Sequence, residues 1–274
     1  MPRLPGHSWV VTLMPFLEED NVLRRWDYFV EWSSDDNVDI GQTDVALLTC
    51  PSKSEYTQGD LNYVINAGNG SVALIDEYDG ADMSGKFPTE VQMHSHNMIP
   101  IDWDENGQVW DKVDGSTTRD TGVSWVHLGS KNFSFRIDRI RDGCSHTLLF
   151  GENYRTGWGE TRAIVRHNWS NPSVLTCAFV YPVNTDDTKA SNFSDPPRPN
   201  GISGLPNDDE SLSVAPFLSS QHPSLVNVVM VDGSIRTIAD DMDRVVYKAW
   251  MTPNGAGGRI VGIQSESAVS HQLD

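Results

Sequence analysis

The strongest local constraint on the fold is a predicted β-hairpin near the end of the chain, in residues 219–238. Residues 226–231 are apolar and rich in β-branched side chains, and Asp232 and Gly233 follow them as the dipeptide most typical of a tight hairpin turn. Residues 234–238 then alternate polar and apolar side chains. A run that is apolar on both faces is typical of a doubly buried strand, so we expect this hairpin to lie centrally in a sheet.

His222 precedes the first strand, and nine residues separate it from Asp232. This H-x(9)-DG pattern resembles the signature of a large family of uncharacterised bacterial proteins, which is most familiar from planctomycetes. In that family the domain usually follows a prepilin-type N-terminal helix.

Three further segments resemble the family and occur in the family's order. Residues 7–27 are similar to its opening "W…LLPYLEQ-N…WD" segment, residues 48–52 to its "L-x-CPS" step, and residues 137–153 to its "ITDGTSNTLLLGEN" block. Cys144 and His146 depart from that block, where Thr and Asn are expected. The resemblance covers most of the chain.

The resemblance implies a single domain over residues 1–274, similar to the globular head of a pilin or pseudopilin. It also implies a structural signature made of six residues: Asp142, Gly143, His222, Asn227, Asp232 and Gly233. His222 and Asp232 would lie about 30 Å apart along one extended strand, which excludes a catalytic pair within that strand. We therefore expect His222 to anchor the entry of the strand and Asp232 to shape the turn.

Hydrophobic patterning predicts an α+β fold, with helices near both chain ends and a mostly antiparallel sheet between them. Strands are predicted in seven segments besides the hairpin: residues 45–50, 61–67, 123–128, 133–140, 148–150, 162–166 and 175–181. Residues 72–75 could pair back against the strand at 61–67. Two long excursions, about 76–121 and 185–216, are predicted loops, as is a polar stretch at 33–39, and the tail from about 265 is expected to fray.

Helices are predicted at residues 9–25, interrupted by Pro15, and at residues 239–251. In the first, Leu17, Val22 and Leu23 are expected to face the core. In the second, the expected core face consists of Met242, Val245, Val246 and Ala249.

The formal net charge of −18 bears on the partners. It disfavours nucleic acid and anionic membrane surfaces, because phosphate binding requires a basic footprint. No apolar run approaches the roughly 20 residues of a membrane-spanning helix. Residues 1–6 contain two prolines and no apolar core of a signal peptide, so an export segment has either been removed or was never present. The resemblance alone places the protein in the cell envelope or outside the cell.

Cys50, Cys144 and Cys177 allow at most one internal disulfide, and neither a disulfide scaffold nor a CxxC metal site fits their spacing.

A calcium-loop pattern occurs in the first excursion. Asp102, Asp104 and Asn106 have the D-x-D-x-N-G spacing, with Gly107 at the sharp turn, but Val113 stands where the bidentate Glu is expected. Asp111 or Asp114, which flank that position, can substitute as an oxygen ligand. The alternatives are a calcium site and a solvated acidic turn, and no cofactor is required.

His94 and His96 would place two imidazoles on one face of a strand, but the sequence shows no nearby third ligand for zinc or copper.

The chain contains nine tryptophans, several in predicted loops. Exposed indole rings can stack on sugars, which suggests Trp103, Trp110 and Trp158 as a glycan-binding set; the alternative is that most tryptophans anchor the core.

No nucleophile elbow, phosphate loop, zinc-protease helix or dinucleotide fingerprint occurs, so we expect no enzyme. Two hypotheses follow. The first is a non-catalytic structural or assembly protein that acts through protein–protein contacts, including self-association. The second is a calcium-dependent glycan-binding module.

Overall fold

The computed structural model describes residues 6–53, 58–71, 103–104, 106–107, 113, 116–117, 120–124, 136–154, 156, 168–172, 174–183 and 218–255. The two predicted excursions and the tail lie largely outside these residues. So do residues 72–75, the predicted strand at 162–166, the predicted strand at 123–128, apart from its first two residues, and the first three residues of that at 133–140.

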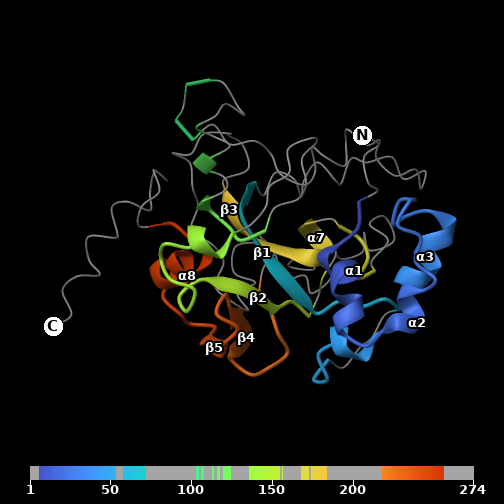
Figure 1. Ribbon diagram of the computed structural model, residues 1–274. Helices are drawn as coiled ribbons and strands as arrows, with labels where there is room; N and C mark the ends of the chain where they lie inside the picture. Colours follow the sequence, from blue (N-terminus) through green and yellow to red (C-terminus); the bar gives the residue numbers. More distant parts are fainter. Residues whose placement is uncertain are drawn as a thin grey trace.

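The fold is α+β and is built on a five-stranded mixed sheet with the order β3-β1-β2-β4-β5 (Figure 1). Its strands are β1 (Tyr63–Ser71), β2 (Leu148–Glu152), β3 (Ala178–Val183), β4 (Leu225–Met230) and β5 (Ile235–Ala239). β1 pairs in parallel with β3, and the β1–β2, β2–β4 and β4–β5 pairs are antiparallel. The predicted strands at 61–67 and 148–150 are present as β1 and β2.

The predicted hairpin is present as β4 and β5, with Asp232 and Gly233 in its turn and Gly233 at a φ of 82°. Its predicted central position is wrong, because β5 is an edge strand of the sheet. β4 alternates buried and half-buried residues, so only one of its faces is fully covered. The apolar side chains on both faces of β4 therefore do not mean that both faces are buried. β4 lies next to the edge strand, and one of its faces is better covered than the other.

The N-terminal segment forms α1 (Trp9–Leu13), a 3-10 turn (Met14–Phe16) and α2 (Asp20–Leu23). The interruption predicted at Pro15 is confirmed. The Ser8 side chain caps α1 by accepting a hydrogen bond from the backbone N–H of Val10, and it also donates to the carbonyl of Trp169. Val22 is buried, and Leu17 and Leu23 pack against the same core, as predicted.

Two local predictions in the next segment are wrong. Residues expected to form a polar loop fold as α3 (Asp35–Gly41), and the expected strand at 45–50 is a 3-10 turn (Ala46–Leu48). The helix was missed because its residues are mostly polar. One of them, Asn37, is nevertheless buried, and its side-chain amide donates to the carbonyl of Asp27 at 2.8 Å. Asp35 in the first turn also favours a helix, because its charge complements the helix dipole.

The C-terminal helix, α8 (Arg244–Met251), begins five residues later than predicted. Its buried face is formed by Tyr247 and Met251, whereas Val246 and Ala249 of the predicted face are exposed. The one-turn helix α7 (Val174–Cys177) occupies the start of the strand predicted at 175–181, and β3 follows it directly. A 3-10 turn (Ile137–Arg139) lies in the strand predicted at 133–140.

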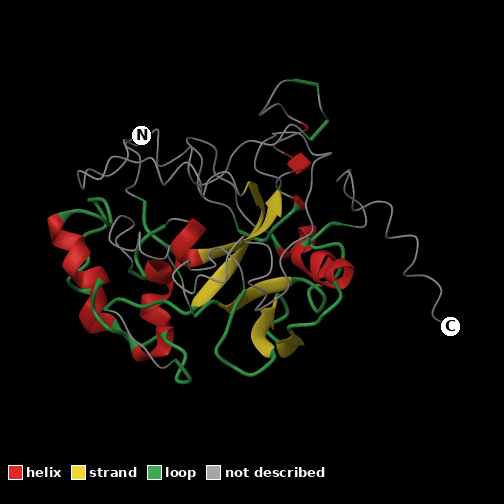
Figure 2. Ribbon diagram, turned by 180° about the vertical axis from the view of Figure 1, so that it is seen from behind, coloured by secondary structure: helices red, strands yellow, loops and turns green. Residues whose placement is uncertain are grey.

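Among the described residues, two large hydrophobic clusters lie beside the sheet, and a smaller one joins Ala67, Ala178 and Val180. The first lies among the N-terminal helices and includes Trp26, Trp32, Leu61 and Trp169. The second lies between the sheet and α8 and includes Val64, Leu148, Phe179, Val226, Val228, Met230, Tyr247 and Met251. Figure 2 shows the N-terminal helices on one side of the sheet and α8 on the other. Within the described part of the chain, no helix has the length and apolar character needed to cross a bilayer.

Candidate functional site

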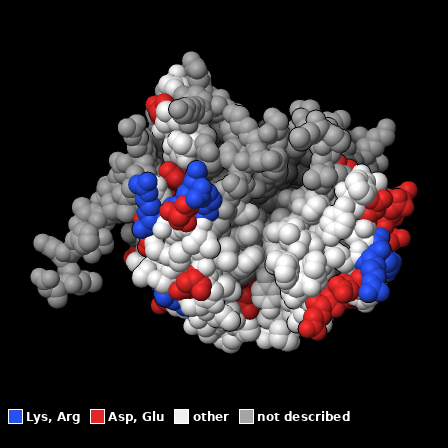
Figure 3. All heavy atoms as spheres, in the orientation of Figure 1, with Lys and Arg blue, Asp and Glu red and all other residues white. Residues whose placement is uncertain are grey.

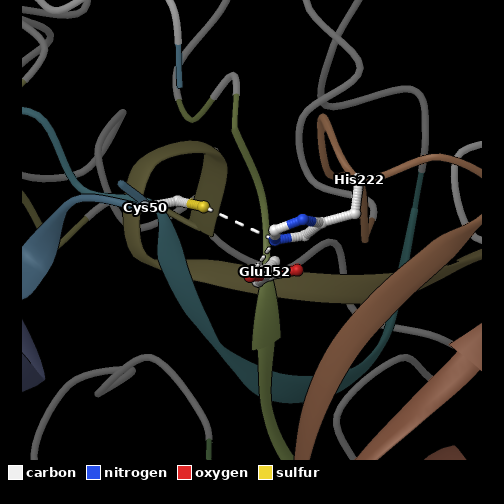
Figure 4. Close-up of side chains that lie close together, drawn as sticks. All are labelled: Cys50, Glu152 and His222. Carbon is white, nitrogen blue, oxygen red and sulfur yellow. Dashed lines mark hydrogen bonds and ion pairs between the residues drawn. The ribbon is translucent and has the colours of Figure 1, made fainter. Parts of the chain in front are cut away.

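Three chemically active side chains from distant parts of the chain meet beside the sheet. Cys50 follows the Ala46–Leu48 turn, Glu152 ends β2, and His222 lies in the loop before β4. The Cys50 Sγ atom lies 3.6 Å from Nε2 of His222, and the same nitrogen lies 3.3 Å from Oε1 of Glu152. One ligand atom from each side chain lies within 4.8 Å of the others. Figure 4 shows the three side chains pointing toward one another.

Glu152 is the fixed member of this cluster. It is only 5% exposed, and both of its carboxylate oxygens accept hydrogen bonds from Asn227 in β4. The Asn227 side-chain amide donates to Oε1 at 3.0 Å, and its backbone N–H donates to Oε2 at 2.9 Å. Because β2 pairs with β4, the carboxylate is held in place by the neighbouring strand.

A short turn before β4 positions His222. The Ser220 hydroxyl donates to the carbonyl of Leu225 at 2.5 Å and accepts from the backbone N–H of His222 at 3.1 Å. Ser224 adopts a φ of 55°, a conformation that is uncommon for a residue other than glycine. The Ser220 side chain therefore holds the turn at His222 and at Leu225. The imidazole of His222 is half-buried next to Glu152.

Cys50 is held by contacts to the residue that precedes β1. Its backbone N–H donates to the side-chain carbonyl of Asn62 at 2.9 Å, and the thiol is buried. Close by, Lys53 and Asp60 form a buried ion pair at 2.5 Å. All three cysteines are free thiols, with Cys144 half-buried and Cys177 buried.

The electrostatic effect of the cluster is visible at Tyr63, which pairs with Glu152 across β1 and β2. Burial raises the pKa of the Tyr63 hydroxyl, and the negative charges of Cys50 and Glu152 raise it further. Deprotonating Tyr63 would place another negative charge beside the carboxylate.

The geometry limits the chemistry that the cluster can perform. A nucleophile–base–acid relay uses opposite nitrogens of the histidine ring, whereas here Nε2 faces both the thiol and the carboxylate. A shallow recess adjoins the cluster, and it holds no enclosed space for even one water molecule, whereas typical small-molecule sites measure roughly 300–1,000 Å³. It is lined by Cys50, Lys53, Asn62, Glu152, Tyr154, Ser220 and Gln221. This arrangement suits an ion better than an organic substrate.

The six residues of the expected structural signature fall into two places. His222 and Asn227 contact Glu152, whereas Asp232 accepts from the backbone N–H and the hydroxyl of Ser234 in the hairpin turn, at 2.9 and 2.6 Å. Those two bonds are the largest causes that lower the pKa of the Asp232 carboxyl.

The remaining two, Asp142 and Gly143, tie a second turn to the end of α8. The Asp142 side chain accepts from the backbone N–H of Gly255 at 2.6 Å, and Gly143 has a φ of 95°. The six signature residues therefore do not form one site. They lie in two separate turns and at the start of β4.

Only half of the predicted calcium ligands can be placed. Asp104 and Asn106 are exposed, the backbone N–H of Asn106 donates to the Asp104 side chain at 3.3 Å, and Gly107 has a φ of 83°. Asp102 and Asp111 lie outside the described residues, so the calcium ligand set stays a prediction.

The predicted glycan-binding tryptophans fare differently. Trp103 is 2% exposed, which leaves no ring face open for stacking on a sugar, while Trp110 and Trp158 lie outside the described residues. Trp26, Trp32 and Trp169 are buried in the first core. The described part of the chain therefore uses these four indoles as interior anchors.

Comparison with known proteins identifies the family. The family model described as "Protein of unknown function (DUF1559)" matches residues 2–245. The chain belongs to the DUF1559 family. No curated protein and no solved structure matches it. All three members of the cluster lie within the part of the chain that matches the DUF1559 model.

Sequence reasoning did not single out Cys50, Glu152 or Ser220 as site residues. Cys50 and Glu152 each lie within a segment that resembles the family, as does His222. The segment of Glu152 also contains Cys144 and His146, so the sequence alone could not have selected Glu152 as the partner of Cys50 and His222. No spacing rule connects them, because their proximity is created by the pairing of β1, β2 and β4.

Proposed function

We propose that this DUF1559 chain is a non-catalytic structural or assembly protein, pilin- or pseudopilin-like, that acts at the cell envelope or outside the cell by associating with further copies of itself. The envelope location rests on the resemblance of its segments to a prepilin-associated family.

The main support is the exposure of large apolar side chains in the N-terminal helical part. Phe16, Phe29 and Leu47 are 79%, 85% and 60% exposed, and Tyr28 beside them in sequence is also exposed. A folded monomer gains nothing from two almost fully exposed phenylalanines, whereas protein interfaces are enriched in aromatic residues.

The charge distribution gives further support. On the face shown in Figure 3, most acidic and basic side chains of the described residues gather toward the two sides, and few lie between them. The core of a protein–protein interface is typically depleted of charged residues in this way. The net charge of −18 keeps unassembled copies apart, so assembly requires a specific apolar contact.

The non-catalytic part of the proposal rests on the cluster. Its carboxylate is occupied by two hydrogen bonds from Asn227, and its imidazole presents a single nitrogen to both neighbours. These contacts connect β2, β4 and the segment before β1, so the role they support is to stabilise the fold.

The test is sedimentation velocity of the full chain over a wide concentration range, with calcium and again with a chelator. We expect a larger species at high concentration, and a shift to monomer in the double variant Phe16→Ser, Phe29→Ser. Ile137→Ser, which removes a 65% exposed apolar residue from another part of the chain, is the matched control and should behave as wild type. A wild-type chain that stays monomeric throughout would refute self-association.

Dissociation by the chelator alone would assign the Asp102–Asp111 loop to assembly as a calcium element. The glycan-binding alternative receives no support from the described residues, since Trp103 is buried.

A further inference from the structure

We propose that Cys50, Glu152 and His222 form a binding site for a single divalent metal ion of borderline softness, with Zn²⁺ the best match. This inference goes beyond the proposed assembly function. The site would supply one sulfur, one nitrogen and one oxygen ligand, from three segments that are far apart in sequence.

The distances within the cluster agree with tetrahedral coordination. Zn²⁺ binds sulfur at about 2.3 Å and nitrogen or oxygen at about 2.0–2.2 Å. At tetrahedral angles these bond lengths place sulfur roughly 3.6 Å from nitrogen, and nitrogen roughly 3.4 Å from oxygen. The observed separations are 3.6 Å between Cys50 Sγ and His222 Nε2, and 3.3 Å between Nε2 and Glu152 Oε1. Two of the three ligand–ligand separations thus match those around a tetrahedral ion, and the third, between the Cys50 sulfur and the Glu152 carboxylate, lies within 4.8 Å.

The neighbouring residues hold the ligands as an outer shell does in known metal sites. Asn227 donates to both oxygens of Glu152 and fixes the carboxylate from the side of β4. Ser220 fixes the backbone at His222, and Asn62 fixes that at Cys50. Each ligand therefore has its own hydrogen-bonded support, so binding requires little rearrangement.

The donor set selects the class of ion. A thiolate together with an imidazole favours Zn²⁺ over the hard cations Ca²⁺ and Mg²⁺, which take oxygen ligands. On binding, the Cys50 thiol loses its proton to solvent and a sulfur–metal bond forms. The ion then replaces the direct contact between His222 and Glu152. One thiolate and one carboxylate balance the two positive charges of the ion.

The recess beside the cluster marks the side from which an ion can enter. Cys50 and Glu152 line it together with Tyr154, Ser220 and Gln221, and it holds no enclosed space for a water molecule. The His222 side chain is 25% exposed, so the ring can turn and open the site as an ion enters. In the assembly context the ion would stiffen the joint between the sheet and the N-terminal helical part.

Cobalt substitution gives a direct test on the full chain freed of metal by a chelator. We expect one Co²⁺ to bind, with thiolate-to-cobalt charge-transfer absorption and intense visible bands of tetrahedral geometry, and Zn²⁺ to displace it. Zn²⁺ should also raise the melting temperature. A wild-type chain without the charge-transfer band overturns the proposal.

Variants then assign the ligands. Cys50→Ser should abolish the charge-transfer band, and His222→Gln should weaken Co²⁺ binding by at least about tenfold. The matched controls are Cys144→Ser and His146→Gln, a second cysteine and histidine outside the cluster, which should bind as wild type. Because His222 is partly exposed, His222→Gln should fold even if Cys50→Ser does not, and circular dichroism checks both. Loss of the band in Cys144→Ser with retention in Cys50→Ser overturns the proposal.

Discussion

Asn227 holds both carboxylate oxygens of Glu152, from a position 75 residues later in the chain. The backbone N–H of Asn227 donates a hydrogen bond to one oxygen of the Glu152 carboxylate, and its side-chain amide donates to the other. β2 and β4 are thus joined by a side-chain clamp beside their backbone ladder, and the clamp lies next to His222.

Replacing Asn227 tests the clamp. Asn227→Ala removes the donor to Oε1 and leaves the backbone donor, so we expect it to lower the free energy of unfolding by about 1.5–3 kcal/mol, the usual worth of a hydrogen bond to a charged group. Asn227→Asp should cost more, because it places a second carboxylate against the first. Urea unfolding in the presence of a chelator measures both. The control is Thr237→Ala, the exposed register partner on β5, expected within about 0.5 kcal/mol of wild type. Equal effects of Asn227→Ala and Thr237→Ala would refute the clamp.

Removing one partner of the buried ion pair between Lys53 and Asp60 should destabilise the fold strongly, whereas replacing both partners by apolar residues should destabilise it much less. Lys53→Met leaves a carboxylate that is 1% exposed without this partner, so we expect a loss of about 3–5 kcal/mol. Adding Asp60→Leu should recover much of that loss. The exposed pair Arg136–Asp138 is the control: breaking it should cost at most about 1 kcal/mol. A double-mutant cycle with no coupling between Lys53 and Asp60 would contradict the burial of the pair.

Alkaline pH should destabilise the fold through its buried weak acids. Burial raises the pKa of the Cys177 thiol from its ordinary 9.0 to about 12. Above pH 9 the unfolded chain releases this proton while the folded chain keeps it, so stability falls by up to about 1.4 kcal/mol per pH unit until pH 12. Burial also raises the pKa of Tyr247, which adds to the fall from about pH 10.

Urea midpoints at pH 8 and pH 10.5 measure this loss. Cys177→Ala should reduce the loss and retain the part that Tyr247 contributes. Cys144→Ala, at a half-buried thiol, should keep the wild-type dependence. Identical pH dependence in the two variants would mean that Cys177 does not contribute.

A close backbone approach between Gly68 and Gly122 should tolerate no side chain. A Cβ at Gly122 would lie 2.3 Å from the nitrogen of Gly68 and 2.5 Å from its Cα, and both are backbone atoms. We expect Gly122→Ala to cost about 3 kcal/mol, the upper end for overpacking. Gly233→Ala meets no atom within 4 Å and strains only a positive φ, so it should cost about 1 kcal/mol. Thermal unfolding ranks the two, and the reverse order would contradict the close approach.

Local signals predicted the elements whose structure is decided locally. The Asp232–Gly233 turn and the interruption at Pro15 are set by backbone preferences of the residues themselves, and both were predictable. The position of the hairpin was not, since strand order depends on which distant strands pair. The predicted core face at the C-terminal helix was right for Met242, which packs against the second core, and wrong for Val246 and Ala249, which are exposed because Tyr247 and Met251 form the buried face of α8.

The candidate site was predictable only in its parts. The His222 pattern pointed to a strand anchor, but the anchor point, Glu152, lies 70 residues earlier, and Cys50 lies 172 residues earlier. No periodicity spans such distances. α3 was missed for a related reason: its polar residues include Asn37, whose amide is buried by contacts that only the folded loop provides.

Cys50 and His222 lie 172 positions apart, which also separates them in time. At synthesis rates of about 5–20 residues per second, Cys50 is added to the chain roughly 9–34 s before His222. Throughout that interval Cys50 has neither its histidine nor the Asn227 clamp beside it. Oxidation of the nascent thiol would prevent the cluster from closing, so the yield of correctly assembled protein should depend on the redox state that the growing chain meets first.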